Sequence, residues 1–113
     1  MKISLQGFGE NVATLEAASG VVKGSLVKIT GNGKVGVCGK DDVFCGVALN
    51  VREGVAAVQL GGYVQIPCET GVAVGYQSLS VSQDGKAQVA ASGGRQILVA
   101  DCDSANNVCG VIL

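Results

Sequence analysis

Glycine-centred turns at short intervals constrain the fold of this chain more than any other feature. Its 113 residues include 18 glycines and a single proline, and short valine-rich segments lie between the glycines. Segments of this length form poor helices, because nucleating a helix is costly. Branched valine side chains suit a pleated sheet, and glycine suits tight turns. The sequence therefore predicts an all-β domain.

Two of the turns carry residue pairs that favour hairpins. Asn32-Gly33 and Asp84-Gly85 each separate two apolar segments. A two-residue type I′ turn needs positive φ at both central residues, and these pairs adopt it readily. Each turn is followed by a lysine and an apolar segment, so we expect a hairpin at both places.

The second half of the chain resembles the first. Besides the two hairpin turns, Cys45–Leu49 (CGVAL) resembles Cys109–Leu113 (CGVIL). This predicts one domain over residues 1–113 with an internal pseudo-repeat, at about 24–49 and 75–113. The motifs lie about twice as far apart in the second copy, which implies an insertion there. Duplication and similar turn chemistry would both explain the likeness.

About nine short strands in this length predict a small barrel or sandwich with at most one short helix. Residues 11–17 fit a strand or a short helix equally well. The expected strands cover residues 2–6, 25–30, 34–38, 43–51, 55–67, 77–82, 86–91, 96–101 and 108–113.

The longest extended segment, Val55–Pro67, alternates apolar and polar residues. Such alternation predicts a half-buried strand with one wet face. Gln59, Tyr63 and Gln65 fall on that wet face. Gly61-Gly62 predicts a bend or bulge of the kind that barrels use to curl.

Composition argues against several classes of function. The net charge is −1, and the eight lysines and arginines are scattered, so we expect no nucleic-acid binding. No apolar run approaches the roughly 18 residues of a membrane span. No secretory signal is evident in the first residues, so we expect synthesis in the cytosol.

Chemical sites are also poorly supplied. The chain has no histidine, and no nucleophile with a base beside it is evident. Asp41-Asp42 is best interpreted as a solvated loop, since it lacks the spaced ligands of a calcium site. Cys38/Cys45 and Cys102/Cys109 share a spacing wider than zinc pairs usually have. We expect no catalytic, cofactor or metal site, and five cysteines that are free, buried thiols.

An ordered series of motifs resembles a phage family. Val21–Val27, Cys45–Leu49, Gly61–Pro67 and Val74–Tyr76 follow the order Gly-x-x-Val, Gly-Val-Ala, Gly-x-Val-x-Ile-Pro and Val-Gly. This order is similar to that of the small capsid cement, or head decoration, proteins of tailed phages and prophages. The resemblance covers most of the chain after about Gly20. It implies a compact β-barrel, often trimeric, that binds the major capsid protein on the outer capsid surface and stabilises the head.

We therefore expect a non-enzymatic virion protein, made in the bacterial cytoplasm. The candidate contact residues are Phe8 and Glu10 near the start and Gln59, Tyr63 and Gln65 on the long strand. Tyr63 is the strongest candidate, because exposed tyrosines often anchor interfaces; it would equally serve to cap a barrel end. A small ligand- or carbohydrate-binding β-module is the alternative, although four aromatic residues supply a binding platform poorly.

Overall fold

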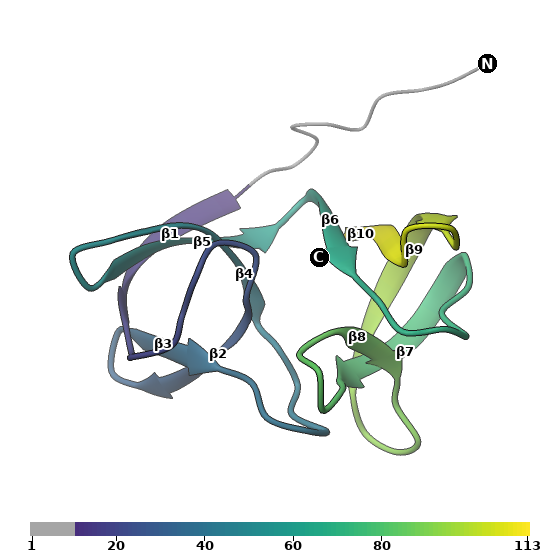
Figure 1. The fold of residues 1–113 in the computed structure, drawn as a ribbon, viewed down its shortest axis with the longest axis horizontal. Helices are drawn as coiled ribbons and strands as arrows, with labels where there is room; N and C mark the ends of the chain where they lie inside the picture. Colours follow the sequence, from purple (N-terminus) through teal and green to yellow (C-terminus); the bar gives the residue numbers. More distant parts are fainter. Residues whose placement is uncertain (1–10) are drawn as a thin grey trace.

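The computed structural model describes residues 11–113 and shows an all-β protein (Figure 1). Its ten strands form a closed five-stranded barrel and a second five-stranded sheet, which confirms the predicted fold class. Within the described part of the chain, no helix is long and apolar enough to cross a membrane. The strands are β1 (Asn11–Ala17), β2 (Leu26–Gly31), β3 (Lys34–Val37), β4 (Gly46–Arg52), β5 (Val55–Gly61), β6 (Tyr63–Pro67), β7 (Gly75–Val81), β8 (Ala87–Val89), β9 (Arg95–Asp103) and β10 (Val108–Ile112).

The first described segment of the chain forms a strand of the barrel. The strand expected at residues 2–6 lies outside the described residues. Residues 11–17, which fitted helix or strand, form β1, because this segment pairs antiparallel with β5 and in parallel with β3. The pairing closes the barrel in the order β1-β3-β2-β4-β5. A small apolar core fills it, comprising Val21, Val27, Val35, Ala48, Ala56 and Val58.

The predicted long strand at 55–67 is divided between the two sheets. β5 belongs to the barrel and β6 to the second sheet, and the chain crosses between them at Gly62, whose φ is +84°. The Nε2 of Gln59 donates hydrogen bonds of 2.9 Å to the carbonyl oxygens of Gly61 and Tyr63. Gln59 is only 3% exposed. The prediction that Gln59 lies on an exposed face is therefore wrong: its amide side chain holds the crossing in place.

The second sheet repeats the strand order of the barrel. Its order is β6-β10-β9-β7-β8. In this comparison β6 corresponds to β1, β7 to β2, β8 to β3, β9 to β4 and β10 to β5. Each pair of neighbouring strands in the second sheet then matches a pair of neighbouring strands in the barrel. The barrel is closed by parallel pairing of β1 with β3. In the second sheet the corresponding contact is one parallel bridge between Cys68 and Ala87. The second sheet thus has the strand order of the barrel, but only this isolated bridge links its two edges.

This repetition changes how the sequence motifs correspond. The two hairpin turns occupy equivalent places, between β2 and β3 and between β7 and β8. The motif at Cys45–Leu49 leads into β4, whereas the one at Cys109–Leu113 lies in β10. The strand that takes the place of β4 is β9, so the two cysteine motifs are not equivalent. The wider spacing in the second half needs no insertion, because the second motif lies one strand further along.

A loop from the barrel completes the core of the second sheet. Residues 38–45, between β3 and β4, cross to β7, where the Asp41 N–H donates to the Val81 carbonyl at 2.8 Å and the Val81 N–H donates to the Asp42 carbonyl at 2.9 Å. Phe44 is fully buried in the same cluster as Leu79, Ile97 and Val111. Residues of both five-stranded units therefore meet in this cluster, which is the shared core of the two units and lies beside the separate core of the barrel.

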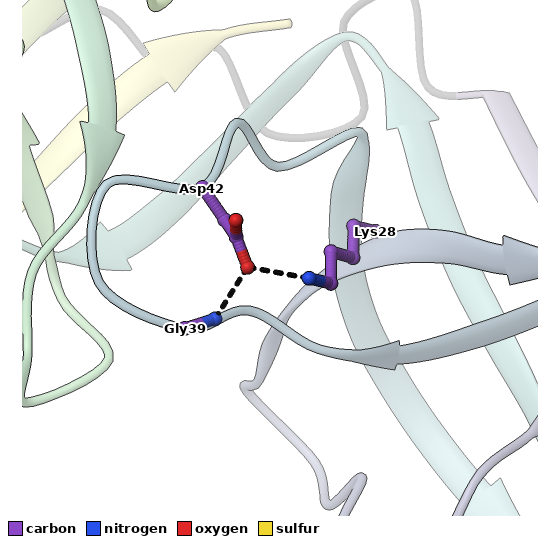
Figure 2. Close-up of polar contacts among 3 residues, drawn as sticks. All are labelled: Lys28, Gly39 and Asp42. Carbon is purple, nitrogen blue, oxygen red and sulfur yellow. Dashed lines mark hydrogen bonds and ion pairs between the residues drawn. The ribbon is translucent and has the colours of Figure 1, made fainter.

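An ion pair fixes the shape of this loop (Figure 2). Lys28 on β2 donates to the carboxylate of Asp42 at 2.5 Å, and the Gly39 N–H donates to the same oxygen at 2.7 Å. The hydrogen bond from Lys28 is the main reason that the pKa of Asp42 lies below its usual value, and the pKa of Lys28 is raised by the same bond. Both groups are thus charged at neutral pH and hold the loop against β2.

Truncating Phe44 should weaken the whole chain rather than one half. We expect Phe44→Ala to lower the free energy of unfolding by about 3–5 kcal/mol, because it removes a fully buried ring and leaves a cavity. Urea unfolding measures the loss, and Val43→Ala, at an exposed neighbour, is the control. A loss below about 1 kcal/mol, the size of an average substitution, would contradict the shared core.

The Lys28–Asp42 pair predicts a pH dependence. Because the folded-state pKa of Asp42 is lowered, its stabilising contribution is present above about pH 4, where an unfolded aspartate titrates. It is lost as the pH falls through the folded-state pKa. Asp42→Asn should therefore lower the urea midpoint at pH 7. The difference between its midpoint and that of the unsubstituted protein should disappear in acid. Asp84→Asn, which gives the second hairpin the Asn-Gly pair of the first, is the control. A deficit that stays constant down to acid pH would show that the charge is not the cause.

Candidate contact surface

The outer face of the second sheet carries a row of apolar side chains that crosses four strands. Tyr63 on β6 pairs with Ile112 on β10, Ile112 pairs with Leu98 on β9, and Leu98 pairs with Tyr76 on β7. Directly paired residues project from the same face of a sheet. The neighbours of Leu98 in sequence, Ile97 and Val99, are buried on the opposite face. We call the row, together with Gln65 and Asp101 beside it, the tyrosine face.

The two tyrosines at the ends of the row differ in how firmly they are held. The Tyr63 hydroxyl donates to the two carboxylate oxygens of Asp101 at 3.2 and 3.3 Å, and one of these oxygens also accepts the Gly110 N–H at 3.0 Å. Partial burial is the main cause of a raised pKa at Tyr63, so the hydroxyl keeps its proton. Tyr76, in contrast, is 71% exposed.

Gly110 makes the position of Tyr63 possible. A Cβ built on Gly110 would lie 2.6 Å from Cζ of Tyr63 and closer still to its hydroxyl oxygen and to a carboxylate oxygen of Asp101. The Tyr63 side chain therefore lies directly over the glycine and reaches from β6 across β10 to β9. An aromatic ring over a strand glycine covers the backbone that the glycine leaves bare.

The predicted contact residues that the structure describes differ in how deeply they are buried. Gln65 is exposed, as expected, and Tyr63 is half-buried. Gln59 is excluded from the surface by its burial, while Phe8 and Glu10 lie outside the described residues. Tyr76 was not predicted as a contact residue, although an aromatic residue beside Gly75 was a usable signal. It was overlooked because pairing of β7 with β9, far apart in sequence, brings Tyr76 into this row.

A hollow lined by polar and apolar residues lies on the outer surface of the barrel, on the strands that correspond to those of the tyrosine face. It is shallow and open, and it lies over β1, β4 and β5. Its walls lack the convergent groups expected of a ligand pocket. The residues that line it are Thr14, Asn50, Arg52, Glu53, Val55 and Ala57.

The acidic residues, the cysteines and Phe44 of the described chain form no metal or aromatic binding site. Among residues 11–113, no group of three or more acidic or cysteine side chains is arranged to hold a metal ion. Burial raises the pKa of Cys38 to about 11, which keeps that thiol protonated at neutral pH. The expectation of five buried thiols is wrong for Cys102, which is exposed, and for Cys45, which is only half-buried. Phe44 is fully buried and contributes to no aromatic platform.

The fold is that of a solved phage structure. The chain is similar to the head fiber gp8.5 N base in bacteriophage phi29, with a TM-score of 0.64 and 15% sequence identity over 92% of this chain and 93% of that chain. No family model matches the sequence, and no curated protein matches it either. The likeness establishes that this chain has the same fold, over nearly its whole length, as the base of a phage head fiber.

The contact between Tyr63 and Gly110 generates a prediction about stability. Gly110→Ala should lower the free energy of unfolding by about 1–3 kcal/mol, the usual cost of overpacking, because the new methyl group displaces the tyrosine side chain. In a Tyr63→Ala background the same change should cost less, so a double-mutant cycle in urea measures the coupling. Strictly additive effects of the two changes would contradict the contact.

Proposed function

We propose that this protein is a non-enzymatic virion structural protein that binds the major capsid protein on the outer capsid surface and stabilises the head. The observation that carries the proposal is the fold shared with the phi29 head fiber base over more than nine-tenths of both chains. The order of sequence motifs, which resembles that of capsid cement proteins, supports the same conclusion independently.

The physical properties of the chain suit this role. Hairpins with tight turns and a shared core leave little conformational entropy to be lost on docking. A modest contact that is repeated over a capsid lattice adds up to large total stabilisation. The low share of charged residues, 15%, also suits a surface that a partner covers.

The tyrosine face is the contact surface that we propose. Tyr76 is 71% exposed, and the neighbouring apolar side chains of Leu98 and Ile112 are only half-buried. Asp101, the carboxylate of this face, is already engaged by Tyr63 and by the Gly110 N–H. Tyrosine anchors of this kind often dominate interface energies. Gln65, which is exposed beside them, supplies a polar contact at the edge.

We also propose synthesis in the bacterial cytoplasm and assembly into a homo-oligomer, a trimer by analogy with the cement proteins. Light scattering coupled to size-exclusion chromatography measures the mass in solution. A monomer at all concentrations would contradict the oligomer and would leave capsid binding to be judged by its own experiment.

Co-sedimentation tests capsid binding directly. The purified protein is mixed with expanded capsids of the phage or prophage that encodes it and pelleted through a density cushion. We expect saturable co-sedimentation and increased resistance of the capsids to heat. Absence of binding at micromolar protein would contradict the proposal.

Single substitutions locate the contact. Tyr76→Ala should weaken capsid binding by about tenfold or more, as the loss of an interface anchor does, while leaving the urea midpoint nearly unchanged. Val22→Ala, at a side chain that is 61% exposed on the barrel, is the matched control. Equal binding by both variants would exclude the tyrosine face as the contact.

A further inference from the structure

Three of the five cysteines meet at one end of the second sheet. The sulfur of Cys109 lies 2.8 Å from that of Cys68 and 3.0 Å from that of Cys102. All three are free thiols; Cys68 and Cys109 are buried, whereas Cys102 is exposed. We call these residues the thiol row, in which Cys109 on β10 contacts Cys102 on β9 and Cys68, which directly follows β6.

Strand register produces this arrangement. Cys109 on β10 lies directly opposite Cys102 on β9, and on its other side it lies opposite Ile66, two residues before Cys68. The Cys68 N–H donates to the Asn107 carbonyl at 2.9 Å, which holds Cys68 beside β10. Opposed residues of antiparallel strands have Cβ atoms about 4.5–5.5 Å apart, and a disulfide needs about 3.5–4.5 Å. Small side-chain and backbone adjustments would therefore suffice to form the bond.

We propose that the thiol row is a disulfide-exchange site, in which a low-molecular-weight disulfide such as oxidised glutathione reacts at Cys102 and Cys109 then forms a disulfide within the chain. This site is independent of capsid binding. It uses two buried thiols and the exposed Cys102, none of which belongs to the tyrosine face.

The reaction proceeds by two thiol–disulfide exchanges. The Cys102 thiolate attacks one sulfur of oxidised glutathione, the glutathione disulfide bond breaks, and one glutathione leaves as a thiolate that takes up a proton. The Cys109 thiolate then attacks the Cys102 sulfur and expels the second glutathione in the same way. Two protein thiols lose two electrons in total, and one glutathione disulfide becomes two glutathione thiols.

The exposures of the three thiols set the order of events. Cys102 is accessible to a dissolved disulfide, while Cys68 and Cys109 are not. Burial is the main cause of a raised pKa at Cys109, and the hydrogen bonds with Cys68 and Cys102 raise it further. Few Cys109 thiolates exist at neutral pH, so Cys109 is a poor first nucleophile. In a final thiol–disulfide exchange with no net oxidation, the Cys68 thiolate attacks the Cys109 sulfur, and Cys102 leaves as a thiolate. The Cys102–Cys109 disulfide is thereby replaced by a Cys68–Cys109 disulfide in the core.

The experiment follows oxidation of the folded full-length chain in glutathione buffers of increasing oxidising strength. Free thiols are alkylated at each step, and the protein is then digested with proteases that cut at Asp and Glu. These cuts place Cys68, Cys102 and Cys109 on different peptides, so mass spectrometry identifies the pairing. We expect loss of two of the five thiols and an intramolecular disulfide that contains Cys109, with Cys102 as its first partner.

Variants separate the proposed roles. Cys102→Ser should slow oxidation by about tenfold or more, because only buried thiols remain in the row. Cys109→Ser should stop at a mixed disulfide between Cys102 and glutathione. Cys45→Ser, outside the row, should oxidise like the unsubstituted protein. The proposal is overturned if all five thiols of the unsubstituted protein stay free, or if its disulfide lacks Cys109; these two outcomes need no variant to fold.

Discussion

The structure depends on burial of the loop between β3 and β4 against the second sheet. Each five-stranded unit is small, and a unit of this size buries too little apolar surface to be stable with ease. Phe44, Leu26 and Val47 from the first half join the same cluster as Leu79 and Val111 from the second. Backbone hydrogen bonds between Asp41, Asp42 and Val81 align the loop so that Phe44 enters that core. The two units therefore stabilise each other.

The same coupling is consistent with the proposal that this protein acts through its surfaces rather than through a pocket. Apolar side chains fill both interiors, which leaves the outer faces of the sheets to interact with other molecules. On the second sheet that face presents two tyrosines in one row, one tied to Asp101 and one free to contact a partner. A rigid block with such a face suits the proposed role in a repeated assembly.

Local signals in the sequence predicted the parts of the fold that depend on local chemistry. The hairpins at Asn32-Gly33 and Asp84-Gly85 were predicted correctly, because these residue pairs favour tight turns. Their predicted type I′ geometry is wrong, because Gly33 and Gly85 have positive φ whereas Asn32 and Asp84 do not. The alternation over Val55–Pro67 correctly indicated extended structure. It did not show that the chain passes from one sheet to the other at Gly62. Gln59 is buried because the chain folds back over it at that crossing, a contact that a period-two pattern does not encode.

The candidate sites were harder to predict, because they are assembled by pairing between distant strands. Tyr63 and Gln65 were found from one strand alone, whereas Tyr76 and Leu98 join them only through the pairing of β7, β9 and β10. Likewise, Cys102 and Cys109 are close in sequence, but Cys68 reaches them through the pairing of β6 with β10. Strand order in the second sheet therefore determines both sites, and it follows the order of the barrel.

Native-state amide hydrogen exchange tests the shared core most directly. If the two units stabilise each other, the slowest amides of the barrel, such as those of Val27 and Val58, should exchange with the same free energy of opening as those of Val99 and Val111 in the second sheet. That value should equal the global free energy of unfolding. Two separate classes of slow amides, one for each unit, would contradict the account.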